Sequence, residues 1–467
     1  MISAQFLTSL WVIGIVLHIM LIACAFLIFL ERKVSAWTQD RAGPNRYGFG
    51  ALIRYGVNLI VGIICSPLLL VGIRVDPDKL IWGSFGDRFM KQRHLGLGLA
   101  LYDGLKLIMK EDYTPPHVDR GLFLLAPILA VVPAMIGWAV MPWGGTWVFP
   151  ELTLPLIGTI ASQTVQVAVL PISIGLIYVL AMGSLAVYGV ALAGYASNNK
   201  YSFLGGLRAT AQMLSYEIPL GLSVLIMILT FGTASAGFIT DVQGSAGFFG
   251  FGAGDNPYAG TWGLFLHPLL AVIFFIAVLA ENNRAPFDLA EAEQELVGGF
   301  HTEYTSMKWA LFFLGEYMHM ITGCAFFCVL FLGGWDLLPF VELVPVVAVG
   351  WAGLGLVGLK LLIFGVKVTL LLFVMMWVRW TLPRLRFDQL MKLAWRGLIP
   401  MTLVMMLLTG LLIWRDWPVW TLPLANVVVC LGTVWIGPRM PKGPSVNRKI
   451  RLPGSRFYPP LTEQATG

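Results

Sequence analysis

The sequence predicts an all-α integral membrane protein that crosses the bilayer about nine times. Three observations support this fold class. Hydrophobic residues make up 57% of the chain and charged residues only 12%, a composition outside the range of soluble globular domains. Apolar runs long enough to cross a bilayer recur along the chain. Lysine and arginine are concentrated in alternate connections between these runs, as expected for a protein with several spans.

The apolar runs define the predicted spans, which together form a single transmembrane domain over residues 1–436. The first run is not a cleaved signal peptide, because it is too long, lacks a basic segment before it and ends at Glu31-Arg32-Lys33. The predicted spans cover residues 7–30, 121–142, 166–193, 209–231, 262–280, 309–333, 355–377, 397–414 and 419–436.

The basic residues predict the orientation of the chain. Twenty-eight of the 31 Lys and Arg residues fall in connections on one side of the membrane. By the positive-inside rule this side is cytoplasmic, so the N-terminus is predicted to lie outside and the C-terminus inside. The net charge of +6 therefore reflects topology and gives no reason to expect a nucleic-acid partner. The basic connections are 31–120, 195–208, 281–308, 378–396 and 437–467.

Three segments outside the spans also have a predicted location. Residues 49–97 include a short apolar run broken by Pro67, and one more crossing here would put every later connection on the wrong side. We therefore expect this insertion to stay on the cytoplasmic side as a re-entrant or interfacial segment. Residues 98–110 are amphipathic and are predicted to form a helix on the membrane surface. Residues 437–467 are predicted to form a basic cytoplasmic tail.

The sequence contains no pattern for a resident redox centre or nucleotide site. All five cysteines fall within apolar runs, and no His or further Cys is near Cys324 and Cys328 to complete a metal set. Buried apolar thiols explain them better. An iron–sulfur ladder, a G-x-G-x-x-G fingerprint after a strand and a Walker loop are also absent from the sequence. Any redox or nucleotide chemistry is therefore expected to come from partner chains.

Residues 279–304 carry an unusual density of acidic side chains for such an apolar chain. Glu291 and Glu295 stand four residues apart, so they share a face if the segment is helical, while Glu293 points elsewhere. Carboxylates crowded beside apolar spans are costly unless a polar cavity receives them, and neighbouring carboxylates raise each other's pKa values. A solvated loop between two spans is the simpler alternative. The charged residues in or beside the segment are Glu281, Arg284, Asp288, Glu291, Glu293, Glu295, Glu303 and Glu316.

Glu217 is the acidic residue that the sequence places deepest in the membrane. It lies nine residues beyond Arg208 in the fourth span, which corresponds to roughly 13 Å of helix and a position close to the midplane. Intramembrane acids usually belong to ion paths, although a neutral glutamic acid hydrogen-bonded within the bundle is an alternative. Lys367 is also predicted to be buried, so the two residues could instead form a charge pair. Lys360 is expected to snorkel outward.

Several long motifs make the chain similar to one family of respiratory membrane proteins. They match in order along most of residues 1–415, which is far more specific than a single short motif. On these motifs the chain resembles the quinone-chamber membrane component (the H-subunit) of the proton-pumping NADH:quinone oxidoreductase, respiratory complex I. The matching stretches include E-R-K-V-S-A-W-T-Q-D-R-A-G-P-N (31–45), D-G-L-K-L (103–107), A-G-Y-A-S-N-N-K-Y (193–201), Q-M-L-S-Y-E-I-P-L-G (212–221), E-N-N-R-A-P-F-D-L-A-E-A-E-Q-E-L-V-G-G-F (281–300) and W-V-R-W-T-L-P-R-L-R-F-D-Q-L-M (377–391).

The resemblance implies a membrane protein that lines the membrane half of a quinone chamber and couples quinone reduction to proton translocation. The substrate is expected to be a quinone, either ubiquinone or menaquinone. FMN and iron–sulfur clusters are expected only in partner subunits, and no metal site is expected in this chain. Residues expected on the proton or coupling path are Glu217, Glu281, Asp288, Glu291, Glu293, Glu303 and Glu316. Residues expected in the quinone chamber are Arg32, Arg41, Asp103, Arg284, Phe287 and Phe300.

The resemblance also implies partners and a location. The expected partners are the peripheral-arm quinone-site and iron–sulfur subunits, small membrane subunits, antiporter-like subunits and membrane lipid, in the cell inner (plasma) membrane. Two alternatives stay open. A homologous membrane component of a membrane-bound hydrogenase or another complex not fed by NADH would keep similar carboxylates. A stand-alone proton-coupled transporter is less consistent, because the chain has no inverted repeat and its acids cluster on the cytoplasmic side.

Overall fold

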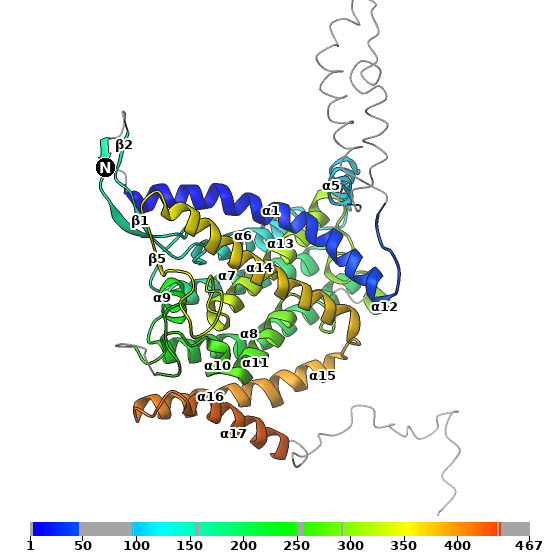
Figure 1. The fold of residues 1–467 in the computed structure, drawn as a ribbon. Helices are drawn as coiled ribbons and strands as arrows, with labels where there is room; N and C mark the ends of the chain where they lie inside the picture. The colour runs from blue at the N-terminus through cyan, green and yellow to red at the C-terminus, as the bar shows by residue number, and fades with distance from the viewer. Residues whose placement is uncertain are drawn as a thin grey trace, which may run out of the picture.

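The computed structural model is a bundle of long helices, with α1 along one side and α16 and α17 along the opposite side (Figure 1). It describes residues 3–45, 96, 98–154, 158–250, 256–290, 293–436 and 439. The longer helices are α1 (Ala4–Thr38), α6 (Arg120–Gly137), α7 (Gly175–Ala196), α8 (Lys200–Phe231), α11 (Pro268–Glu281), α13 (Ser306–Phe331), α14 (Gly353–Thr381), α16 (Ile399–Trp414) and α17 (Thr421–Ile436).

The helices confirm the predicted class, an all-α integral membrane protein. In the described part of the chain, seven helices are long and apolar enough to cross a membrane. Two shorter helices, α11 and α17, are apolar as well. Each predicted span coincides with one of these nine helices. How many of them cross the bilayer, and in which direction, stays a prediction.

The third predicted span begins too early. The sequence predicts it from residue 166, but α7 begins at Gly175 and Gln163–Gln166 form strand β4. The backbone amides between these elements donate to a neighbouring loop, Val167 N to Gly145 O at 2.9 Å and Leu170 N to Ala139 O at 2.9 Å. Because these amides are already paired, the apolar residues of this stretch pack against the bundle without forming a helix.

A small sheet closes the end of the bundle at which α1 begins (Figure 1). Strand β1 (Thr146–Phe149) lies between β4, to which it is antiparallel, and β5 (Val347–Val349), to which it is parallel. Strands β2 (Leu152–Leu154) and β3 (Gly158–Ile160) form a separate hairpin. The buried Trp147 donates its indole N–H to Gly350 O at 3.0 Å. Strands of three or four residues are too short for their alternation to be recognised in the sequence.

Glycines allow α6, α7 and α8 to approach one another closely. A Cβ on Gly189 of α7 would lie 2.7 Å from the backbone nitrogen of Ala130 in α6. A Cβ on Gly194 would lie 2.9 Å from the Cα of Gly206 in α8. Small residues at such crossings are typical of helix packing in membranes. These contacts fix α7 and α8, which carry Gly183, Ser184 and Glu217.

Helix α5 confirms the predicted amphipathic helix at residues 98–110. It packs against α1 and α13 and leaves the apolar residues Leu101, Leu105 and Ile108 exposed. Apart from Gly96, the insertion at 49–97 lies outside the described residues, as does the tail at 437–467 apart from Arg439. The remaining short elements are α5 (Leu99–Met109), η2 (Trp138–Val140), α9 (Ala236–Gln243), α10 (Gly263–Leu266), α12 (Glu293–Leu296), η3 (Gly299–His301), α15 (Phe387–Lys392) and the π-turn η4 (Leu393–Leu398).

The two lysines of α14 lie inside the protein and bind backbone carbonyls. Lys360 does not snorkel outward: its side chain is fully buried, donates to Val346 O at 2.6 Å and lies 4.0 Å from the ring centroid of Trp335. Lys367 donates to the carbonyls of Leu332 and Asp336. The predicted alternative of a Glu217–Lys367 pair is therefore not what the structure contains.

Candidate functional site

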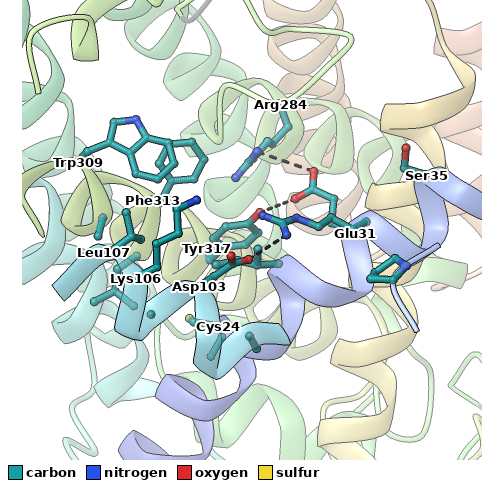
Figure 2. Close-up of a pocket in the computed structure, with 18 of the residues that line it drawn as sticks. Cys24, Glu31, Ser35, Asp103, Lys106, Leu107, Arg284, Trp309, Phe313 and Tyr317 are labelled. Carbon is teal, nitrogen blue, oxygen red and sulfur yellow. Dashed lines mark hydrogen bonds and ion pairs between the residues drawn. The ribbon is translucent and has the colours of Figure 1, made fainter. Parts of the chain in front are cut away.

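A cavity of about 880 Å³ opens among α1, α5, α13 and the last turn of α14 (Figure 2). Helix α5 and the end of α1 near it lie at the end of the bundle opposite the sheet (Figure 1). The cavity wall is mostly apolar, with aromatic rings on one side. Four of the predicted chamber residues line it, namely Arg32, Arg41, Asp103 and Arg284. The charged and phenolic groups that line it without having been predicted are Glu31, Lys106, Tyr317 and Arg379.

Glu31, Arg284, Glu316, Tyr317 and Arg379 form an inner charge cluster at the buried end of this cavity. Glu31 accepts a hydrogen bond from the Tyr317 hydroxyl and forms an ion pair with the Arg379 guanidinium, and its Oε1 lies 3.9 Å from Arg284 Nη1. Arg284 Nε lies 2.9 Å from Glu316 Oε1. Figure 2 shows Arg284, Glu31 and Tyr317 converging on one side of the cavity.

The cluster balances its own charge. Two guanidinium groups face two carboxylates, and the Arg284 and Glu31 residues are only 4% and 8% exposed. The Arg284 guanidinium also lies 4.7 Å from the Tyr317 ring centroid, in a cation–π contact. Buried charges persist only when they are paired and hydrogen-bonded. A change in the charge of a molecule in the cavity would therefore act directly on these pairs.

An ion pair joins α1 and α5 at the side of the cavity. Arg32 Nη1 lies 2.9 Å from Asp103 Oδ2, and both side chains keep some exposure. Figure 2 shows Lys106 of α5 reaching into the same space. The amphipathic helix is thus attached to α1 by a charge contact, while its apolar residues face outward.

Two small cavities continue from the inner charge cluster into the bundle. The first, of about 50 Å³, is lined by Glu316, Glu281 and His319. The second, of about 30 Å³, is also lined by Glu281 and His319, and by Gly183 of α7. A water molecule needs roughly 10–15 Å³ of such space, so each cavity has room for water beside polar partners.

Glu281 and Glu217 lie together against α7, at the inner end of these cavities. The Ser184 hydroxyl of α7 donates to Glu217 Oε1, and Glu281 Oε1 approaches the neighbouring Gly183. The two carboxylates are close enough to repel each other. Of the predicted path residues, the structure brings Glu217, Glu281 and Glu316 into this arrangement.

The remaining predicted path residues lie elsewhere. Glu303 accepts a hydrogen bond from Asn199 Nδ2 at 2.7 Å and is outside these three cavities. Asp288 is partly buried in the loop after α11. Glu291 and the side chain of Glu293 fall outside the described residues. Glu295 pairs with Arg208 at 2.8 Å on the surface, as a solvated acid would.

The two predicted chamber phenylalanines do not line the large cavity. Phe287 is buried against Tyr216, with ring centroids 5.5 Å apart, and its carbonyl accepts a hydrogen bond from Gln212. Phe300 lines the 50 Å³ cavity and packs edge-on against Phe312 at 5.4 Å. Aromatic rings on the large cavity come instead from Trp309, Phe313, Tyr317 and Trp380.

Sequence reasoning missed Glu31, Tyr317 and Arg379 as members of the site. Glu31 belongs to the E-R-K stretch that ends the first span, and Arg379 to the W-V-R-W stretch that ends the seventh. Because basic residues are expected at the cytoplasmic ends of spans, the charges in both stretches were already accounted for without a role in a site. Only the packing of α1 against α13 and α14 brings their side chains together.

The fold and site define a multi-pass α-helical membrane protein in which an apolar cavity ends on buried, paired charges and continues into a row of carboxyl groups. A family model described as NADH dehydrogenase matches residues 11–410. The chain belongs to this family.

Curated relatives agree with this assignment, and all three named here are H-subunits of NADH-quinone oxidoreductase. The first of them, numbered 1 in Geobacter sulfurreducens, is 40% identical over 370 residues, covering 78% of this chain and 97% of that protein. The relative from Leptospira biflexa is 38% identical over 403 residues, covering 85% and 93%. The relative numbered 2 in Koribacter versatilis is 37% identical over 418 residues, covering 87% and 97%.

Proposed function

We propose that this chain is the membrane component of an NADH:quinone oxidoreductase that forms the membrane part of the quinone-binding chamber, and that it couples quinone reduction to proton translocation. The names of its relatives support the complex. The partners are then the peripheral subunits that carry the iron–sulfur clusters and the other quinone-site residues, small membrane subunits and antiporter-like subunits. The location is the bacterial inner membrane, with the large cavity on the cytoplasmic side.

The large cavity has the properties that a quinone requires. Its volume of about 880 Å³ falls in the range of small-molecule sites, and its wall is mostly apolar with few polar groups. The ring of a quinone fits between aromatic side chains such as Trp309 and Phe313, and its carbonyl oxygens accept hydrogen bonds from donors such as Tyr317 or Lys106. Either ubiquinone or menaquinone satisfies this description.

The chemistry of the substrate supplies the coupling. A quinone gains two electrons from a partner's cluster and two protons from its surroundings to become a hydroquinone. During this change the charge at the buried end of the cavity alters, and the Glu31–Arg379 and Arg284–Glu316 pairs respond by shifting where protons bind. Glu316 also lines the 50 Å³ cavity, so a proton gained or lost there is passed toward Glu281 and Glu217.

The strongest support is that Glu316 belongs both to the charge cluster of the large cavity and to the row of carboxyl groups inside the bundle. One side chain thereby links the substrate cavity to the buried acids. Coupling requires that a change of proton affinity at the substrate cavity be linked to a change of proton affinity at the buried acids.

The substitution Glu217→Gln tests this function in the assembled complex. The amide keeps the size of the side chain but holds no transferable proton, so we expect assembly to persist while proton-coupled quinone reductase activity in proteoliposomes is abolished. Glu295→Gln is the matched control, because this glutamate pairs with Arg208 on the surface. Normal proton-coupled turnover in Glu217→Gln would overturn the assignment.

A further inference from the structure

His319 is a buried titratable residue inside the bundle that the proposed coupling path does not yet use. It lies on α13, three residues after Glu316, so the two side chains project from neighbouring positions of one helix face. We propose that His319 carries protons between Glu316 and Glu281. This proposal rests on the proposed function, because it adds a residue to the same path.

One cavity brings His319 and the two acids together, because Glu316, Glu281 and His319 all line the 50 Å³ cavity. Both the 50 Å³ and the 30 Å³ cavities are lined by His319, and both are also lined by Glu281. Glu316 lines only the first, on the side of the inner charge cluster. The imidazole therefore borders both cavities, as Glu281 does, whereas Glu316 borders only the first.

The His319 imidazole also has one ring nitrogen available for a further hydrogen bond. Its Nε2 atom is buried and has no hydrogen-bond partner among the described residues. Buried polar atoms are normally paired with protein or water, so an open Nε2 beside a cavity of this size indicates a water or a transferred proton there. A histidine held only for packing would be expected to have this nitrogen satisfied by a fixed neighbour.

The groups around His319 are suited to exchange a proton with it. Glu281 faces it from α11, Glu316 from its own helix, and Glu217 of α8 lies beyond Glu281. Asn282 lines the 50 Å³ cavity and Thr322 lines the 30 Å³ cavity, and each provides a neutral hydrogen-bonding group. In the described residues these cavities contain no lysine or arginine that would hold the ring neutral by repulsion.

The transfer conserves protons and involves no electrons. A protonated Glu316 releases its proton, directly or through a cavity water, to one ring nitrogen of His319. The other ring nitrogen releases its own proton toward the Glu281 carboxylate, and rotation of the ring or a second water restores the first tautomer. One proton leaves Glu316 and one arrives at Glu281 for each passage.

Three substitutions separate a relay from a packing role. His319→Gln and His319→Asn keep a hydrogen-bonding amide but cannot be protonated, whereas His319→Glu restores a titratable group. Met318→Leu is the matched control, since Met318 is a fully buried neighbour on α13 that lines neither cavity. Each variant is assembled into the full complex and reconstituted in vesicles, where NADH oxidation and proton uptake are recorded from about pH 5.5 to about 8.5, a range that brackets the ordinary pKa of histidine.

We expect His319→Gln and His319→Asn to lower coupled turnover at least ~10-fold, in keeping with the loss of one proton-transfer group. His319→Glu should recover part of this activity with a pH profile displaced toward lower pH, and Met318→Leu should match the unmodified complex. Full coupled activity with an unchanged pH profile in the Gln and Asn variants would overturn the proposal. Failure of all three His319 variants to assemble would also overturn it, in favour of a structural role.

Glu281→Gln, measured in parallel, distinguishes the two proposals. If Glu281→Gln loses coupled activity while His319→Gln retains it, the path stands without the histidine. If both variants retain normal coupling, the proposed function itself fails, because no buried group between the cavity and Glu217 is then required.

Discussion

The Glu281 carboxylate lies against Gly183 of α7, where a Cβ on that glycine would come within 2.8 Å of Glu281 Oε1. The next residue, Ser184, donates its hydroxyl to Glu217. One turn of α7 therefore contacts both acids. Gly183 leaves space for the Glu281 carboxylate, and Ser184 donates a hydrogen bond to Glu217. The Glu281 carboxylate occupies this position because residue 183 has no side chain.

Gly183→Ala is expected to displace the Glu281 carboxylate without unfolding the chain. Alanine favours a helix over glycine by about 1 kcal/mol, so α7 itself should not be weakened. Coupled proton uptake in reconstituted complex should fall, with assembly preserved. Gly221→Ala in α8 is the control, because a Cβ at residue 221 meets nothing within 4 Å. Equal coupling in the two variants would show that the position of Glu281 does not matter.

Arg284→Gln is expected to break the inner charge cluster. The substitution leaves Glu316 without its guanidinium partner and removes a cation beside Glu31, and breaking a buried pair in this way costs about 3–5 kcal/mol. Quinone reductase activity and the thermal stability of the purified complex should both fall. Arg208→Gln removes an exposed pair worth about 0–1 kcal/mol and should leave both measurements nearly unchanged.

Asp241, in the connection after α8, is expected to make stability depend on pH. Burial raises its pKa from 3.8 to about 6, opposed in part by the Thr146 hydroxyl and by Lys360. The folded state therefore holds this proton more tightly than the unfolded chain, so the contribution is fully present below about pH 4 and is lost as pH rises through about 6. Asp241→Asn cannot ionise, and its unfolding temperature should vary less across this interval. An identical pH dependence in both proteins would exclude Asp241 as the source.

Asn426 is expected to attach α17 to the bundle. Its amide donates to Leu422 O at 2.8 Å and lies 3.2 Å from Nδ1 of the fully buried His267. Asn426→Leu leaves the histidine nitrogen unsatisfied, which costs about 1–3 kcal/mol. Thermal unfolding should begin earlier, and limited proteolysis should cut more rapidly near residue 418. Thr433→Ala, at a position on the same helix away from His267, should behave like the unmodified chain.

The positions of the helices could be predicted because their cause is local. Each span is a run of apolar residues, and the basic ends of runs such as 7–30 and 355–377 are evident in the sequence. The depth of Glu217 in the membrane, obtained by counting residues from Arg208, stays a prediction. The start of α7 was missed because residues 166–174 are largely apolar and so look like part of the span. In the structure, backbone amides of this stretch donate hydrogen bonds to residues outside α7. Hydropathy reports burial and cannot distinguish a helix from a buried connection.

The inner charge cluster could not be predicted because its cause is the packing of distant helices. Glu31 and Arg379 are separated by most of the chain, and nothing near either residue indicates the other. Sequence reasoning therefore assigned these acids and bases to their helices but could not identify their partners. The same limit explains Lys360 and Lys367: both were placed within the seventh span, but their carbonyl partners belong to the connection after α13.

Under the proposed function, the sheet at the far end of the bundle bears on where translocated protons leave. Four buried indole side chains, those of Trp138, Trp143, Trp147 and Trp335, belong to the hydrophobic core that includes strand β1 of this three-stranded sheet. An apolar layer of this kind resists hydration, so the proposed function would have protons exit sideways into adjoining polypeptides. On that proposal, the number of protons released per hydroquinone formed would be set by those neighbours, and this chain would determine only when each release begins.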